Sequence, residues 1–101
     1  MPTYLASYDI KETSPDPHST FLKQAAAHNW KLWILATNNI WYRLPNTTLE
    51  GTFANIEAAK AALEATRAAT EREMGRTVTM NKWIIVDYGA SSFNSDQRQN
   101  V

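Results

Sequence analysis

Apolar residues along the chain fall into six runs separated by polar residues. Two of these runs have apolar residues at helical spacing, and they predict helices at about 17–28 and 55–74. The other four are dense in β-branched and aromatic residues, and they predict strands at 3–10, 31–37, 40–44 and 82–88. The chain is therefore predicted to be an α+β protein with the element order βαββαβ.

Local signals at the ends of these elements support the assignment. Asp16 followed by Pro17 is typical of a helix N-cap with proline at the first helical position. Asn38 and Asn39 tolerate the positive φ of a tight hairpin turn, and Gly75 fits the position that follows the second helix. The simplest fold for this order is ferredoxin-like, with a four-stranded antiparallel sheet and two helices on one face.

The chain length of 101 residues allows one domain with one core. We expect this domain to span residues 1–89, with the segment 45–55 as a loop. Residues 90–101 are rich in Ser, Asn and Gln. This composition predicts a polar tail that is disordered or ordered only in a dimer.

The predicted strands are apolar on both faces. In the strand 31–37, for example, Trp33 and Leu35 point away from the side taken by Ile34. A solvated face would instead alternate between apolar and polar residues. Because the helices cover only one face, the second face is predicted to meet another surface, most simply a second copy in a two-fold homodimer. The alternative is a cover formed by the tail and the 45–55 loop.

Composition excludes several classes of protein. The chain has no Cys, which rules out disulfides, zinc ribbons and thiol catalysis. No apolar run approaches the ~18 residues of a membrane span, and the N-terminus lacks a secretory signal pattern, so we expect a cytoplasmic protein without membrane contact. Ten basic and ten acidic residues give a net charge of zero, so any nucleic-acid contact must rest on a local patch.

One rim of the predicted sheet collects chemically interesting side chains. It holds the end of the first strand, the start of the first helix, the hairpin turn and the end of the second helix, and Asp9 is the acid there. A helix N-terminus nearby favours anions, so the rim is predicted to face phosphates. The candidates for nucleic-acid contacts are Lys11, His18, Asn38, Asn39, Arg76 and Lys82. The alternative is that these are ordinary polar loop residues.

The stretch Tyr4–Ile10 ends in Tyr8-Asp9-Ile10 and is followed by a polar loop and a helix. It resembles the opening strand of the CRISPR-associated endoribonuclease family, the small dimeric partner of the spacer integrase, and is nearest to the SinR-like and VapD-like relatives of that family. The stretches 28–43 and 81–88 resemble later strands of those relatives, which carry Trp at similar places.

This resemblance implies a metal-dependent nuclease acting on phosphodiesters of RNA or DNA. In the family, the aspartates that close the first strand face each other across the dimer axis and are proposed to hold a divalent metal. Carried onto this chain, the catalytic and metal-binding residue is Asp9 and the cofactor is Mg²⁺. A hard cation takes oxygen ligands and can activate water, and a dimer supplies two carboxylates from one residue. Other defence-system proteins are implied as partners.

Two other functions stay open. The first is a non-catalytic dimeric scaffold or nucleic-acid-binding module, in which Trp41 and Arg43, on one side of their strand, would stack bases. The second is a ferredoxin-like small-molecule binder with its pocket between sheet and helices. In either function, Asp9 would be a strand-end residue paired with Lys82.

Overall fold

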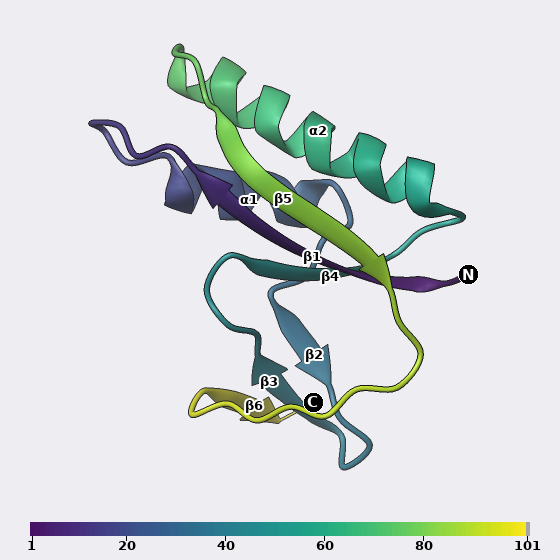
Figure 1. Ribbon diagram of the computed structural model, residues 1–101. Helices are drawn as coiled ribbons and strands as arrows, with labels where there is room; N and C mark the ends of the chain where they lie inside the picture. The colour runs from purple at the N-terminus through teal and green to yellow at the C-terminus, as the bar shows by residue number, and fades with distance from the viewer. Residues whose placement is uncertain (101) are drawn as a thin grey trace.

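The strands form two three-stranded antiparallel sheets (Figure 1). They are seen in a computed structural model that describes residues 1–100. The first sheet has the order β4-β1-β5, made of β1 (Thr3–Ile10), β4 (Thr48–Thr52) and β5 (Met80–Asp87). The second has the order β2-β3-β6, made of β2 (Trp33–Leu35), β3 (Ile40–Arg43) and β6 (Arg98–Asn100). The helices are α1 (His18–Ala27) and α2 (Ile56–Met74).

The α+β class is confirmed, but the sheet differs from the four-stranded one that the sequence predicted. The segment 45–55, predicted as a loop, contains β4, which pairs with β1. The predicted second strand meets this sheet only through a single bridge between Lys31 and Glu50. From Trp33 onward the chain departs as a hairpin and builds the second sheet (Figure 1).

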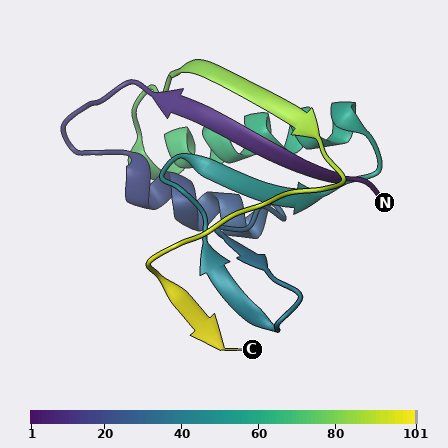
Figure 2. The same ribbon diagram turned by 60° about the horizontal axis from the view of Figure 1, so that its bottom comes forward.

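Both helices cover the same face of the first sheet (Figure 2). Strand geometry places every second residue of β1 on that face. These β1 residues are buried with α1 and α2 side chains in one core: Tyr4, Ala6, Tyr8 and Ile10 with Phe21, Ala25, Ala59 and Leu63. The Tyr8 and Phe21 rings lie 4.7 Å apart between centroids, so this central strand anchors the core.

The start of α1 differs from the prediction by one residue. Pro17, not Asp16, is the N-cap, and no side chain caps the helix there; Asp16 accepts the N–H of His18, the first residue of α1, at 2.9 Å. At α2 the Asn55 side chain caps the helix, since it accepts the Ala58 N–H at 2.8 Å. Gly75 ends α2 with φ 67°, a left-handed conformation that favours glycine. No helix in the part of the chain that the structure describes is both long and apolar enough to cross a membrane.

The C-terminal segment lies against its own chain. β6 pairs with β3, and the Phe93 ring packs edge-on against Tyr42 with centroids 5.5 Å apart. Segment 90–94 also lines a hollow with Leu5 and Thr48, on the face of the first sheet opposite the helices. The structure thus gives the tail a position within one chain, where the sequence predicted disorder or order only in a dimer.

Candidate functional site

Asp9 lies near the end of β1 on the face of the first sheet that the helices leave open. Its neighbours Tyr8 and Ile10 are buried in the core, and the Asp9 side chain is exposed. In the register with β5, Asp9 is opposite Lys82 and Ser7 is opposite Ile84. Directly opposed residues in an antiparallel pair project to the same face. The carboxylate therefore shares its surface with an ammonium, a hydroxyl and an aliphatic side chain.

This end of the sheet is hollowed around the carboxylate. The hollow has a volume of about 250 Å³ and is lined by Ser7, Tyr8, Asp9, Lys82, Trp83 and Ile84. Ile84 is 60% exposed, the most exposed large apolar side chain of the first sheet.

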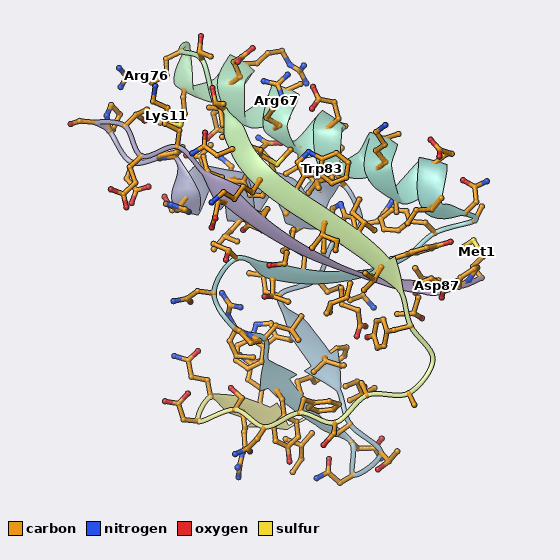
Figure 3. The ribbon with its side chains drawn as sticks, in the orientation of Figure 1. Met1, Lys11, Arg67, Arg76, Trp83 and Asp87 are labelled. Atoms are coloured by element: carbon orange, nitrogen blue, oxygen red, sulfur yellow. The ribbon has the colours of Figure 1, made fainter. Side chains whose placement is uncertain are left out.

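Two further cations lie at the same end of the molecule. The Lys11 N–H donates to the Thr79 oxygen at 2.9 Å, which ties the end of β1 to the approach to β5. The Arg76 guanidinium donates to the Ser14 oxygen. Figure 3 shows Lys11 and Arg76 beside each other where β1 and α2 end. Asp9, Lys11, Arg76 and Lys82 thus lie at one end of the molecule, and this set is called the rim below.

His18 is the first residue of α1, and it interacts with the carboxylate of Asp16. Its N–H donates to Asp16, and its Nε2 lies 4.0 Å from the Asp16 Oδ1. The neighbouring carboxylate offsets the positive charge of the helix N-terminus that was expected to favour anions there.

The structure does not bring Asn38 and Asn39 to this rim. They form the β2–β3 turn in the second sheet, and the adjoining Thr37 lines a hollow with Thr3, at the opposite end of β1 from Asp9. Thr3 and Asp9 are six residue spacings apart along β1, which corresponds to about 20 Å. Asn38 serves the turn itself, since it accepts the Ile40 N–H at 3.1 Å.

The donor set around Asp9 is small, and a second copy would enlarge it. Within residues 1–100, no three His, Cys, Asp or Glu side chains gather as a metal site. The Asp9 hollow offers one carboxylate and the Ser7 hydroxyl. Mg²⁺ is usually bound by one or two carboxylates with several waters. A second copy of Asp9 would complete such a set.

The tyrosines near the sheets are not bases at neutral pH. Burial raises the pKa of Tyr8 to about 12, although the charge of Arg43 opposes the shift. Burial, and then the hydrogen bond to Glu50, raise the pKa of Tyr88 above its usual value. Both hydroxyls therefore stay protonated at neutral pH.

Sequence reasoning gave little weight to a second hollow, on the second sheet. It has a volume of about 420 Å³ and is lined by Ala26, Trp30, Lys31, Leu32, Trp33, Trp41 and Gln99. The signal was present, because a turn at Asn38-Asn39 places Trp33 and Trp41 on the same face of the hairpin. No protein-family model, curated protein or solved structure matches this chain. Its function is therefore inferred from these residues and their geometry.

Proposed function

We propose that this protein is a dimeric, Mg²⁺-dependent nuclease of the CRISPR-associated and VapD-like kind, acting on phosphodiesters of RNA or DNA. Asp9 from two copies would be its catalytic and metal-binding centre. The observation that carries the proposal is the exposed Asp9 carboxylate on the sheet face opposite the helices, beside the exposed Ile84 side chain. A cytoplasmic location and partner proteins of a defence system belong to the same proposal.

The proposal includes a ferredoxin-like strand order for the first sheet. The order β4-β1-β5 supports it, since β5 and β4 flank β1 as the last and third strands of that fold do. The Lys31–Glu50 bridge lies where the remaining strand would pair with β4. The fourth strand would then be reduced to one residue pair.

The mechanism requires two copies to meet face to face. If β5 paired instead with β5 of a second copy around Ile84, strand spacings of about 4.8 Å and residue spacings of about 3.4 Å would place the two Asp9 residues roughly 20 Å apart. That distance is too long for one ion. Sheets packed face to face lie about 10 Å apart, and their side chains fill the gap. A two-fold axis beside Asp9 and Ile84 then brings the carboxylates together and buries the isoleucines.

Each residue of the rim would have a defined task in this dimer. The two Asp9 carboxylates would hold the ion, and Lys11, Arg76 and Lys82 would bind the phosphodiester by its charge. A bound Mg²⁺ would supply Lewis-acid stabilisation of the phosphoryl oxygen and a more acidic water. The exposed Ile84 would exclude bulk water from the interface between the sheets.

A second candidate is a non-catalytic nucleic-acid-binding dimer or scaffold. The position of Lys82 directly opposite Asp9 favours it. In a face-to-face dimer, two Lys82 ammonium groups can balance the two carboxylates without any ion. This candidate predicts the same dimer but no cleavage.

The test is a cleavage assay on single-stranded RNA, single-stranded DNA and duplex DNA, with Mg²⁺ or with EDTA. Asp9→Asn is expected to lower the Mg²⁺-dependent rate at least about 100-fold, since loss of a metal's outer-shell partner alone costs about 10–100-fold. Light scattering should show that the variant stays dimeric. Asp87→Asn, an exposed carboxylate at the far end of β5, is the matched control and should cleave normally. Wild-type protein that cleaves nothing, or unchanged cleavage by Asp9→Asn, overturns the nuclease proposal.

A further inference from the structure

The second sheet is rich in aromatic and basic residues and contains no acid. β2, β3 and β6 carry Trp33, Trp41 and Tyr42 together with Arg43 and Arg98. The whole chain has a net charge of zero, so this sheet is a local concentration of positive charge. Positive charge interleaved with aromatic rings is typical of surfaces that bind single-stranded nucleic acid.

Trp33 and Trp41 lie on one face of this sheet. The register pairs Trp33 with Arg43 and Leu35 with Trp41, so all four side chains project to the same side. The next strand adds Gln99, opposite Trp41. Both indoles are partly exposed, which leaves part of each ring open to a ligand.

One cation lies against the indoles. The Lys31 Nζ lies 5.8 Å from the centroid of the Trp41 ring. The Arg43 guanidinium is engaged by the backbone, since its Nη1 donates to the Leu32 oxygen at 3.2 Å and to the Leu44 oxygen at 3.0 Å. Lys31 is therefore the cation placed next to an aromatic ring of the hollow, where a base and its phosphate need both partners.

The hollow between the indoles is large enough for bases. Its volume of about 420 Å³ falls in the range of ligand sites, roughly 300–1,000 Å³. Trp30 lines the same hollow and is only 1% exposed. Among residues whose side chains the structure describes, its Nε1–H is the one buried side-chain donor or acceptor that lacks a hydrogen-bond partner.

We infer that this face of the second sheet binds single-stranded nucleic acid, with bases stacked on Trp33 and Trp41 and a phosphate held by Lys31. Duplexes are excluded because their bases already stack on one another. Stacking on an aromatic side chain is sequence-tolerant and contributes about 1–3 kcal/mol per base. The inference goes beyond the proposed nuclease, since binding here requires neither Asp9 nor a metal.

The experiment measures binding of labelled oligonucleotides of about ten nucleotides, within the usual site size of such surfaces, by fluorescence anisotropy. The probes are single-stranded RNA, single-stranded DNA and the matching duplex, all in EDTA so that metal-dependent cleavage plays no part. Trp33→Leu and Trp41→Leu are each expected to weaken single-strand binding about 10-fold or more. Asp87→Asn should bind as wild type does. Because binding in EDTA is read without metal and the cleavage assay reads Asp9, failure of the nuclease and failure of this site are separate results.

Further variants distinguish loss of the binding site from unfolding of a tryptophan variant. Trp33→Phe and Trp41→Phe retain an aromatic face and should restore most of the binding. Lys31→Gln should weaken binding and reduce its salt dependence, whereas Lys60→Gln, on the exposed side of α2, should do neither. Binding to RNA, DNA or both supports the inference and names the substrate. Equal binding of the duplex, equal binding of a mononucleotide, or wild-type binding by both leucine variants overturns it.

Discussion

Lys31 and Glu50 exchange both of their backbone hydrogen bonds. The Lys31 N–H donates to the Glu50 oxygen at 2.7 Å, and the Glu50 N–H donates to the Lys31 oxygen at 2.9 Å. Beyond this pair the chain turns away into the second sheet instead of extending along β4. The bridge therefore separates two candidate surfaces: the Asp9 rim on the first sheet and the tryptophan face on the second.

Gly51→Ala is expected to destabilise the fold. A Cβ at this position would lie 2.5 Å from the Phe53 ring and 3.0 Å from both the Asn29 oxygen and the Trp30 ring. Overpacking of this kind costs about 1–3 kcal/mol, and the loss should appear as a lower urea midpoint. Gly89→Ala is the matched control, because a Cβ there meets no atom within 4 Å. Equal midpoints for the two variants would contradict the packing described around Gly51.

Glu71 anchors the turn between α2 and β5. Its carboxylate accepts the N–H of buried Val78 at 3.0 Å, while Arg67 donates to the Val78 oxygen at 3.1 Å. Glu71→Ala leaves that N–H without its partner, which costs about 1–3 kcal/mol of unfolding free energy. Glu71→Gln keeps an acceptor and should lose less, and Arg72→Ala, on the exposed side, should be neutral. The assignment fails if the alanine and glutamine variants at Glu71 are equally destabilised in urea.

Glu73 links the two helices and should make stability depend on acid pH. Hydrogen bonds from Lys23 and Gln24, each 2.8 Å long, hold the Glu73 pKa below its usual 4.5. A depressed folded-state pKa adds stability that is present above about pH 4.5 and is lost as pH falls through the lower folded value. Glu73→Gln should therefore lower Tm at pH 7, and its difference from wild type should shrink as the pH falls below 4.5. Glu12→Gln, in the exposed loop after β1, is the control; a Tm difference for Glu73→Gln that does not change with pH would refute the linkage.

The sequence predicted the long elements well and the short ones less well. β1, α2 and β5 carry strong periodicity, and the end signal at Gly75 was found where expected. The signal at Asp16 was wrong by one residue, because Pro17 is the N-cap of α1. β4 was missed because its two buried positions are Leu49 and Gly51, and a glycine carries no hydrophobic signal. The space beside Gly51 is filled by Phe53 and Trp30, which only the folded chain shows.

Only part of the candidate site could be predicted from the sequence. The exposed position of Asp9 follows from alternation along β1, and pairing of β1 with β5 placed Lys82 beside it, as expected for the rim. Asn38 and Asn39 were misplaced because the rim was built on a four-stranded sheet. The departure of the chain after Lys31 depends on one long-range residue pair, which local sequence patterns do not encode.

The most direct test of the central claim is to replace Mg²⁺ with Mn²⁺ and to measure, by electron paramagnetic resonance, how many Mn²⁺ ions bind per chain. If two copies share one ion through Asp9, wild-type protein should bind one Mn²⁺ per two chains. Asp9→Asn should abolish this binding, and Asp87→Asn should retain it. One ion per chain, no bound ion, or unchanged binding by Asp9→Asn would contradict the shared site.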